Sequence, residues 1–487
     1  MGSLETYFSR FRKHIVGIDA SFRSPYGIRK LIYTDWIASG RLYGPIEEKI
    51  LSSFGPFVGN THTGTSETGS RMTSCYNYAH NIIKEHVHAG QDDVIITAGS
   101  GMTSVVNKLQ RILGLKGCGM LLRRQCLREV DKPVVFVTHM EHHSNHTSWY
   151  ETIADVVVLQ PDRNLLVDPG ELCRQLDRYS GRKFKIGAFT AGSNVTGIIP
   201  PYHELAKIMH EYGGIAFVDF AAVAPYVTID MHLPDPMQKL DAVYFSPHKF
   251  LGGPGSSGVI VFDSKLYRST VPDDPGGGTV DWTNPWGEYK YIDDIEMRED
   301  GGTPGFIQAI RGALAVRLKE EMGVEKIRQR EHELLQLAMN ELEKIPSIRI
   351  LAVNAREKLR ILSFYHPEIH YNLFVKLLSD RFGIQMRGGC VCAGTYGHYL
   401  LEVSYEKSKE ITDRITSGDL STKPGWVRMS LHPVNTDEEV HYIMHAIREI
   451  VNHYRSWASD YHYNRRTNEF THRSFRQDGF LKEWFTL

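Results

Sequence analysis

The sequence predicts an α/β protein, with a mostly parallel sheet in a large domain and a smaller α+β domain after it. Between about residues 92 and 263, short apolar segments alternate with amphipathic helical segments, which is typical of parallel strands joined by helices. A long helical pattern from residue 306 then leads into further strands and helices up to residue 454. At 487 residues, the chain is long enough for two domains with separate cores.

These patterns divide the chain into four parts. We expect an N-terminal arm over residues 1–30, a large domain over 31–325, a small C-terminal domain over 326–460 and an appendage over 461–487. The first part is polar and mixed, and the last is aromatic and basic. The boundary near residue 325 falls inside the long helical pattern, which we interpret as the bridge between the two domains.

Composition excludes several classes of partner. Lys and Arg number 56 against 57 Asp and Glu, a net charge of −1, so no global field favours nucleic acid or an anionic membrane. No apolar run approaches the roughly 18 to 20 residues that span a bilayer, and the first residues lack the apolar core of a signal peptide. We therefore expect a cytoplasmic protein with a small-molecule ligand. Of the six cysteines, only Cys390 and Cys392 are close neighbours, so no disulfide framework is predicted.

Two glycine-rich segments are candidate binding loops. Residues 93–109 run from an apolar strand through Gly99, Ser100 and Gly101 into an amphipathic helix. Free backbone N–H groups and the helix dipole favour an anion at such a turn. Residues 59–73 are rich in Gly, Thr and Ser, and they form either a flexible loop or a loop that contacts substrate through His62.

A strand beginning at Pro133 leads into four histidines around Glu141. A metal site is one explanation, because histidine clusters beside a carboxylate resemble zinc sites. However, His142 and His143 are adjacent and would point apart, and no H-E-x-x-H pattern is present. The alternative is that one imidazole stacks on a planar cofactor while the others are solvated.

Two further strands end in polar residues. The strand from Lys185 ends near Ser193 and Asn194, and the strand IAFV ends at Asp219. Burying an unpaired carboxylate is costly. Asp219 is therefore expected to face a cation or a protonated ring nitrogen.

The next strand carries the most informative residue, Lys249. The apolar run Ala242–Phe245 leads into Ser246, His248 and Lys249, which a Gly/Pro-rich turn follows. Ligands of open α/β sheets bind where strands end, and a desolvated lysine there has its pKa lowered toward the range in which the amine is a nucleophile. An ordinary surface lysine in a loop is the alternative.

Together, an anion turn, a histidine loop, an Asn, an Asp and a Lys describe a pocket for a phosphorylated, planar, cationic aldehyde. In these features the sequence resembles the class V aminotransferase and cysteine desulfurase family of pyridoxal-phosphate enzymes, which have fold type I. The resemblance implies that the mostly parallel sheet of the large domain has seven strands. The resemblance extends from about Tyr33 to Tyr454. It rests on S-x-H-K, E-H-H-x-N, S-N-x-x-G, the V-D strand end, G-G-T-P and W-V-R, which occur in the family's order.

The resemblance implies pyridoxal 5'-phosphate as cofactor and a role for each matching residue. Lys249 would bind the cofactor covalently and later move the α-proton, Asp219 would pair with the pyridinium nitrogen, and His142 would stack on the ring. Asn194 would hydrogen-bond the O3′ of the ring. The phosphate would be bound by Gly101, Met102, Thr103, Ser246 and His248.

The resemblance also implies an amino-acid substrate and a homodimer with shared active sites. Arg428 would bind the α-carboxylate of the substrate through its bidentate guanidinium, with His62 as a further substrate contact. Thr303 of G-G-T-P would reach the phosphate bound by the partner subunit. No metal is implied.

Two features bear on the reaction. Desulfurases usually carry D-x-A-Q after the Asp strand, whereas Ala222 stands here at the Gln position. In MRGGCVCAG, Arg387 and Cys392 match the R-x-G-x-x-C pattern of one desulfurase branch, and Cys390 is additional. A thiolate of low pKa near Arg387 would attack the substrate sulfur. The alternative is that Cys390 and Cys392 are buried thiols of a loop without a catalytic role.

We therefore expect C–S bond cleavage on cysteine or a cysteine-like amino acid, with Lys249, His142 and Cys392 as catalytic residues and a sulfur-acceptor protein as a further partner. An aminotransferase, an epimerase or a β-elimination lyase on the same scaffold is the alternative, because Ala222 departs from the desulfurase pattern. A metal-dependent hydrolase and a non-catalytic scaffold are alternatives of other classes.

Overall fold

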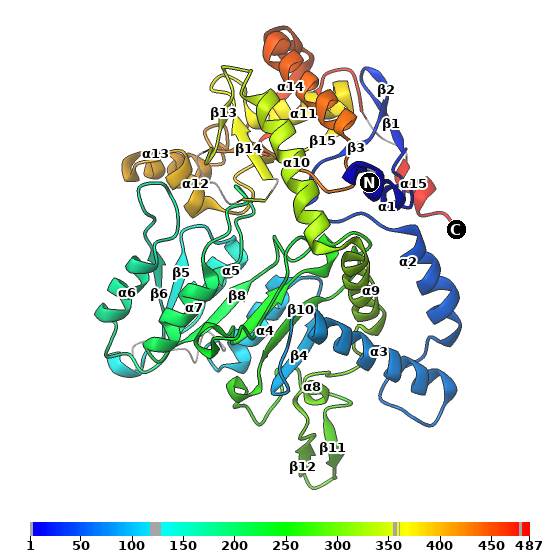
Figure 1. The fold of residues 1–487 in the computed structure, drawn as a ribbon, viewed down its shortest axis with the longest axis vertical. Helices are drawn as coiled ribbons and strands as arrows, with labels where there is room; N and C mark the ends of the chain where they lie inside the picture. Colours follow the sequence, from blue (N-terminus) through cyan, green and yellow to red (C-terminus); the bar gives the residue numbers. More distant parts are fainter. Residues whose placement is uncertain (1–2, 117–127, 354–357, 360, 477–479) are drawn as a thin grey trace.

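The computed structural model describes residues 3–116, 128–353, 358–359, 361–476 and 480–487. Its centre is a seven-stranded sheet in which neighbouring strands are parallel, except that β10 is antiparallel to both β4 and β9. In spatial order the strands are β4 (Asp93–Ala98), β10 (Gly258–Asp263), β9 (Ala242–Phe245), β8 (Ile215–Asp219), β7 (Lys185–Thr190), β5 (Val134–Thr138) and β6 (Asp155–Leu159). The predicted mostly parallel, seven-stranded α/β fold is confirmed (Figure 1).

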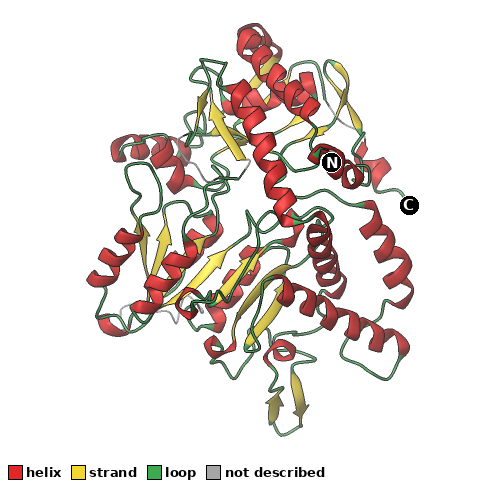
Figure 2. Ribbon diagram, in the orientation of Figure 1, coloured by secondary structure: helices red, strands yellow, loops and turns green. Residues whose placement is uncertain are grey.

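The central strands are apolar because helices cover both faces of this sheet (Figure 2). Every residue of β5, β7 and β9 is buried, as expected for parallel strands sandwiched between layers. The helices of this domain are α3 (Glu67–His86), α4 (Met102–Ile112), α5 (His143–Tyr150), α6 (Pro169–Arg178), α7 (Tyr202–Glu211) and α9 (Phe306–Met322). The loops after β4, β5, β7, β8 and β9 meet at one edge of the sheet, where the candidate site lies.

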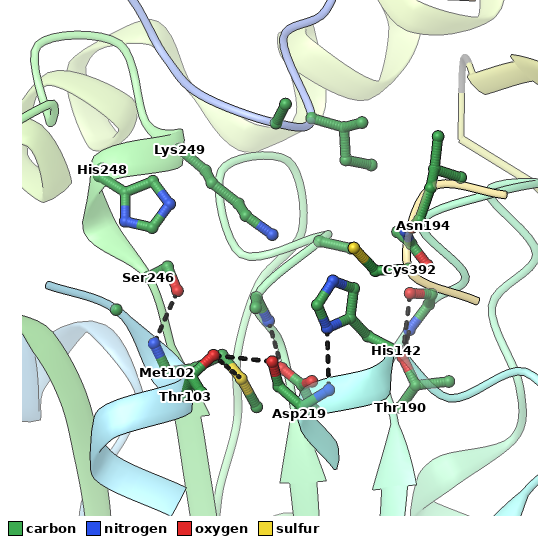
Figure 3. Close-up of a pocket in the computed structure, with 18 of the residues that line it drawn as sticks. Met102, Thr103, His142, Thr190, Asn194, Asp219, Ser246, His248, Lys249 and Cys392 are labelled. Atoms are coloured by element: carbon green, nitrogen blue, oxygen red, sulfur yellow. Dashed lines mark hydrogen bonds between the residues drawn. The ribbon is translucent and has the colours of Figure 1, made fainter. Parts of the chain in front are cut away.

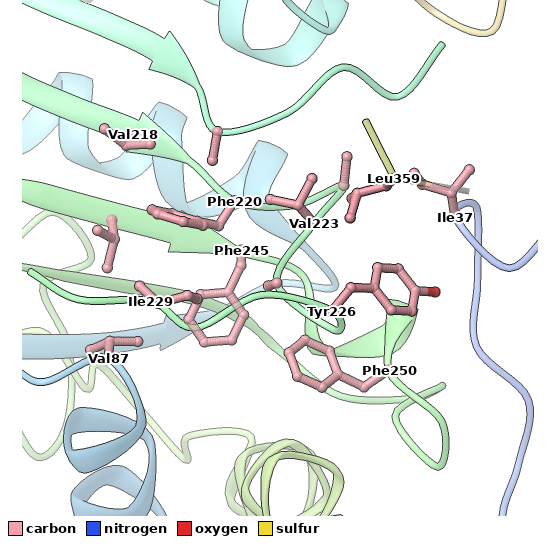
Figure 4. Packing of buried hydrophobic residues seen from close by; sticks show 14 of the residues in the cluster. Ile37, Val87, Val218, Phe220, Val223, Tyr226, Ile229, Phe245, Phe250 and Leu359 are labelled. Atoms are coloured by element: carbon pink, nitrogen blue, oxygen red, sulfur yellow. The ribbon is translucent and has the colours of Figure 1, made fainter. Parts of the chain in front are cut away.

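Aromatic packing fixes the turn that carries Lys249. Phe245 ends β9 and Phe250 follows the lysine; both side chains are buried, with ring centroids 6.0 Å apart. They lie in the core cluster that also contains Val218 and Phe220, next to Asp219 (Figure 4). Burying one such ring contributes about 1.5 to 3 kcal/mol. The residues on either side of the lysine therefore anchor the backbone to the core.

The small domain contains a four-stranded antiparallel sheet and several helices. The strand order is β13 (Arg349–Ile350), β14 (Ile361–Tyr365), β17 (Trp426–Ser430) and β16 (Arg387–Gly389). Its helices are α10 (Val324–Leu342), α11 (Tyr371–Phe382), α12 (Gly394–Leu400), α13 (Tyr405–Thr416) and α14 (Asp437–Trp457). Thr436 and Glu439 form a capping box at the start of α14, which satisfies backbone N–H groups that a helix N-terminus leaves free.

The N-terminal segment packs partly on the small domain. It contains α1 (Leu4–Arg12), β1 (Ser21–Ser24), β2 (Gly27–Lys30), β3 (Ile32–Tyr33) and α2 (Gly44–Lys49). Strand β3 is parallel to β15 (Ile384–Gln385), which follows α11, and Arg12 pairs with Glu439 at 2.6 Å. We expected the large domain to begin at residue 31, and this pairing places residues 32–33 beside the small domain. All the predicted domain limits stay predictions.

The C-terminal appendage begins as a hairpin that packs on α11. The hairpin consists of β18 (Tyr461–Asn464) and β19 (Glu469–His472), and α15 (Phe480–Trp484) follows. The buried Tyr461 donates a hydrogen bond to Asp380 at 3.0 Å. A second exposed hairpin, β11 (Val280–Thr283) with β12 (Tyr289–Tyr291), projects from the large domain before the short helix α8 (Ile295–Arg298) (Figure 1). In the part of the chain described above, no helix is long and apolar enough to cross a membrane.

Candidate active site

A cavity of about 290 Å³ lies at the carboxyl edge of the central sheet (Figure 3). It brings together residues from five loops that follow strands of the central sheet, from two segments of the small domain and from the N-terminal loop at Ile37 and Ala38. Of the predicted site residues, it is lined by Gly101, Met102, Thr103, His142, Asn194, Asp219, Ser246, His248, Lys249, Cys392 and Arg428.

Lys249 ends a single helical turn, Pro247–Lys249, that follows β9. Burial lowers the pKa of its ammonium group to about 8, although the charge of Asp219 acts in the opposite direction. A lysine of lowered pKa has more of the neutral amine at neutral pH, which is the nucleophilic form. The side chain points into the cavity (Figure 3).

Asp219 is the last residue of β8 and is only 4% exposed. Its Oδ1 accepts a hydrogen bond from the backbone N–H of Ala221 at 2.8 Å. Burial raises the pKa of this carboxyl to about 6, and the Lys249 charge opposes the rise. A carboxylate in such a place gains stability from a cationic partner in the cavity.

His142 lies across the cavity from Lys249 (Figure 3). It is the N-cap residue of α5, and its Nδ1 accepts a hydrogen bond from the backbone N–H of Ser144 at 3.1 Å. Burial lowers the pKa of its imidazole to about 3, and the Lys249 charge contributes in the same direction. The ring is therefore neutral at neutral pH, with its proton on Nε2.

An anion cradle lies where β4 turns into α4. The Ser246 hydroxyl accepts a hydrogen bond from the backbone N–H of Met102 at 2.9 Å, so its own hydrogen remains available to an anion. His248 Nδ1 lies 2.9 Å from the Ser100 carbonyl oxygen. A Cβ added at Gly101 would lie 3.0 Å from His248 Cε1 and 3.1 Å from Ser246 Oγ. Only glycine leaves this cradle open.

Asn194 follows β7 and connects the cavity to the small domain. Its Nδ2 donates a hydrogen bond to the Val391 carbonyl at 2.7 Å, and its backbone oxygen accepts one from Arg428 at 3.0 Å. Among the described residues, its buried Oδ1 has no hydrogen-bond partner. Unsatisfied buried polar atoms are rare in folded proteins and indicate an unseen partner.

Asp35 holds two arginines at the cavity. One carboxylate oxygen accepts a hydrogen bond from Arg428 Nη2 at 2.6 Å, and the other accepts one from Arg387 Nε at 2.8 Å. Arg428 is 3% exposed, and its buried Nε finds no partner in the described residues. Both guanidinium groups line the cavity. Two positive charges against one carboxylate leave an excess that suits an anionic substrate group.

Cys392 stands in a tight turn at the same cavity. The Ala393 N–H donates to the Cys390 carbonyl at 3.0 Å, and the two residues between them, Val391 and Cys392, have φ values of 46° and 60°. Positive φ at both central residues is a feature of type I′ turns, which Gly and Asn usually occupy. For a β-branched valine this conformation is an outlier, and each strained residue costs about 1 to 3 kcal/mol.

The histidine cluster does not converge. Glu141 is buried among protein groups and accepts hydrogen bonds from the Thr190 N–H at 2.8 Å and from Asn145 Nδ2 at 2.8 Å. His139 Nε2 lies 3.1 Å from the Leu165 carbonyl oxygen. Within the described ranges, no group of three or more His, Cys, Asp or Glu side chains is arranged to hold a metal ion.

Thr303 and His62 do not line the cavity of their own chain. Both are exposed, and they belong to neighbouring loops: the Gly302 N–H donates to the Gly277 carbonyl at 2.8 Å, and a Cβ added at Gly278 would lie 3.5 Å from the His62 ring. Their predicted roles would therefore need a partner subunit, and they stay predictions.

Comparison with known proteins decides the family. The family model described as "Aminotransferase class-V" matches residues 32–443. The chain belongs to the class-V aminotransferase family. The family consists of pyridoxal-phosphate-dependent enzymes, so membership makes this chain such an enzyme and implies the cofactor.

Several members of the class-V aminotransferase family resemble the chain along most of its length. A "Probable cysteine desulfurase" of Halalkalibacterium halodurans is 28% identical over 376 residues, which cover 74% of this chain and 84% of that protein. The apo structure of a cysteine desulfurase from Thermococcus onnurineus NA1 superposes with a TM-score of 0.72 at 22% identity, over 91% of this chain and 98% of that one. A cysteine desulfurase structure from Escherichia coli gives 0.69 at 22% identity, with the same coverage.

The cavity fits the cofactor of the class-V aminotransferase family. The cradle around Gly101 suits a phosphate, because it lies at the N-terminus of an eleven-residue helix, where the helix dipole favours an anion. The buried carboxylate of Asp219 suits a protonated ring nitrogen. The amine of Lys249 suits an aldehyde, and the unpartnered Asn194 Oδ1 adds a free polar atom.

Sequence reasoning missed two contributors. Sequence reasoning did not connect Asp35 with the two arginines, which lie 352 and 393 residues away in the chain. Of the two explanations for the four histidines around Glu141, one left three of them solvated, whereas His143 is bonded to the turn that carries Cys392. Neither contact leaves a local pattern, because both join segments that only the fold brings together.

Proposed function

We propose that the chain is a cysteine desulfurase-like enzyme that cleaves the C–S bond of cysteine or a cysteine-like amino acid. The observation that carries the proposal is that Cys392 lines the same cavity as Lys249 and Asp219. A thiol that accepts sulfur must lie at the bound substrate, and an ordinary loop cysteine need not. The names of the relatives, cysteine desulfurases by description, support the same chemistry.

Nine residues would hold the cofactor, four at its ring and five at its phosphate. Lys249 would bind it covalently, Asp219 would pair with its ring nitrogen, and His142 would lie on its ring face. Asn194 would contact its O3′ oxygen. The phosphate contacts would come from Gly101, Met102, Thr103, Ser246 and His248.

Once bound, the cofactor supplies an electron sink for the bonds at the substrate Cα. Lys249 Nζ would act as the base that removes the α-proton. Its lowered pKa keeps the amine partly neutral at neutral pH. His142, neutral and half-buried, would cover the cavity from the opposite side and exclude water from the reacting atoms.

The sulfur would pass to Cys392. Its thiolate Sγ would attack the substrate sulfur, so that an S–S bond forms and the substrate C–S bond breaks. The electron pair of the broken bond would stay on the substrate carbon, which a proton converts to the methyl group of alanine. Cysteine and the enzyme thiol would thus become alanine and an enzyme persulfide, with no external oxidant or reductant. A sulfur-acceptor protein would then take the persulfide sulfur.

The substrate carboxylate would bind to Arg428, with Arg387 beside it. Asp35 already occupies one side of each guanidinium, which leaves other N–H groups for a second carboxylate. In a homodimer, Thr303 would contact the phosphate bound by the partner subunit and His62 would contact the substrate there. This shared arrangement accounts for the exposed position of both residues.

The test uses the full-length, cofactor-loaded enzyme with L-cysteine and measures alanine, sulfide and persulfide at each cysteine by mass spectrometry. We expect Cys392→Ser to keep the cofactor absorbance and the spectral change on substrate addition, but to lose sulfide release by at least about 100-fold. Cys390→Ser is the matched control, two residues away, and should lose much less. Full turnover by Cys392→Ser would contradict the assigned thiol.

A second candidate function is an aminotransferase, an epimerase or a β-elimination lyase on another amino acid. Ala222 favours it, because this residue lines the cavity where the desulfurase pattern has Gln. Products separate these reactions from desulfuration: a lyase yields pyruvate from cysteine where a desulfurase yields alanine, and an aminotransferase needs an oxo-acid acceptor.

A further inference from the structure

His143 is adjacent to the cofactor-side His142 but contacts the turn that carries Cys392. Its backbone N–H donates to the Cys392 carbonyl at 2.8 Å, and its ring Nε2 accepts from the Gly394 N–H at 3.0 Å. A Cβ added at Gly394 would lie 3.2 Å from the same nitrogen. One residue of α5 therefore holds the turn at Cys392 and again two residues later.

The turn depends on such outside support. Its own backbone supplies one hydrogen bond, from Ala393 to Cys390, while Val391 and Cys392 both have the positive φ that residues with side chains rarely adopt. Outside the turn, Asn194 bonds the Val391 carbonyl, and His143 provides the other two bonds. A strained conformation persists only where the surroundings impose it.

We propose that His143 is a positioning residue that fixes Cys392 at the substrate sulfur through the Gly394 N–H. The role in sulfur transfer rests on the proposed function. The E-H-H sequence at the start of α5 then serves both sides of the reaction. His142 faces the cofactor, and His143 faces the thiol that receives the sulfur.

The hydrogen bond from the Gly394 N–H to His143 Nε2 requires a neutral imidazole ring. Nε2 accepts from Gly394, so the ring proton must be on Nδ1. A protonated ring would present an N–H to another N–H, and the bond would be lost. Burial lowers the pKa of His143, and the charge of Lys423, which precedes β17, acts in the same direction. On α5 itself, His142 and His146 act on it electrostatically, and among the described residues of the turn the Cys392 carbonyl and the Gly394 N–H bond to it.

The lowered pKa of His143 predicts how sulfur transfer depends on pH. Because the pKa of His143 lies below the ordinary value of about 6.5, the hydrogen bond from Gly394 to His143 is intact at neutral pH. It is lost as the pH falls through the lowered pKa. Sulfur transfer in the wild type should therefore decline on the acid side, separately from cofactor binding.

The test compares three variants of the full-length, cofactor-loaded enzyme. His143→Ala removes the ring, and His143→Gln places an amide oxygen where Nε2 accepts and does not titrate. His146→Ala is the matched control one turn along α5, because its Nδ1 lies 3.4 Å from the Thr395 hydroxyl rather than at the turn backbone. We expect His143→Ala to slow persulfide formation at Cys392 by about 10- to 100-fold, the cost of a small misplacement of a reacting group. The KM for cysteine should change by less than about twofold, because the carboxylate site is untouched. His143→Gln should recover most of the rate and lose the part of the acid decline that His143 causes.

Amide hydrogen exchange gives a readout that needs no substrate. Peptides that contain Ala393 and Gly394 should exchange about tenfold faster in His143→Ala than in the wild type, in His143→Gln or in His146→Ala. Unchanged exchange and unchanged persulfide formation in His143→Ala would overturn the inference, as would an equal loss in His146→Ala. A wild-type enzyme that forms no persulfide at Cys392 would overturn the proposed function instead, even with the expected exchange pattern.

Discussion

The two sides of the cavity are held in place by different kinds of interaction. On the large-domain side, Asp219 ends one strand and Lys249 follows another, and the residues of these strands are entirely or almost entirely buried, so a close-packed sheet fixes their positions. On the small-domain side, Arg428 and Cys392 are held by an ion pair with Asp35 and by hydrogen bonds from α5. Packing is hard to deform locally, whereas a few polar contacts can be broken one at a time.

This difference separates two kinds of substitution. Changes on the sheet side should remove cofactor chemistry altogether. Changes on the small-domain side should leave the cofactor bound while they weaken substrate binding or sulfur transfer. Three experiments, in order of decreasing effect, test this division.

The largest effect is expected at Lys249. Lys249→Ala should lower turnover at least about 10⁴-fold, because it removes both the covalent attachment and the proton-transferring amine. Borohydride treatment of the wild type should fix the cofactor to the peptide that contains Lys249, and the variant should yield no such adduct. Retained turnover, or a labelled peptide elsewhere in the chain, would show that the sheet side does not carry the chemistry.

A smaller effect is expected at Asp35. Asp35→Asn removes one partner of a buried ion pair with Arg428. The free energy of unfolding should therefore fall by about 3 kcal/mol. The KM for the substrate should rise about tenfold through misplacement of the arginine, with a smaller loss of kcat. Cofactor absorbance should be kept.

The matched control for Asp35→Asn is Asp19→Asn. Asp19 also pairs with a cation, Lys30 at 2.8 Å, but its side chain is 81% exposed. Water screens such a surface pair, so the melting temperature and the KM should not change measurably. Loss of the cofactor in Asp35→Asn would contradict the division between the two sides.

The smallest effect is expected in the pH midpoint at which the Lys249 amine becomes reactive. In the cofactor-free protein, the rate at which Lys249 reacts with an amine-specific reagent should rise through about pH 8, the lowered pKa of its amine, rather than through about pH 10.4 as for an ordinary lysine. Asp219→Asn should move the midpoint further down, because the negative charge of Asp219 favours the ammonium form. Mass spectrometry of labelled Lys249 follows both changes, and a midpoint that stays near 10.4 would contradict the desolvated position of the amine.

The large-domain side was predictable because its signals are local. Each strand can be recognised in the sequence as an apolar run, and the residue after it must lie at the carboxyl edge of a parallel sheet. Asp219, Asn194, Lys249 and the Gly101 turn could therefore be placed together from their sequence neighbours alone. The cavity confirms that they meet, while their individual roles stay proposals.

The small-domain side needed the tertiary structure, because its contacts join distant segments. Nothing near Asp35 in the sequence indicates Arg428, 393 residues away, and nothing near His143 indicates Gly394, 251 residues away. The pairing of β3 with β15 is equally remote. The sequence by itself determined which residues stand at the ends of buried strands, since burial and periodicity are local properties. Only the fold decided which charges and hydrogen-bonding groups face them, since such partners are chosen by proximity in space.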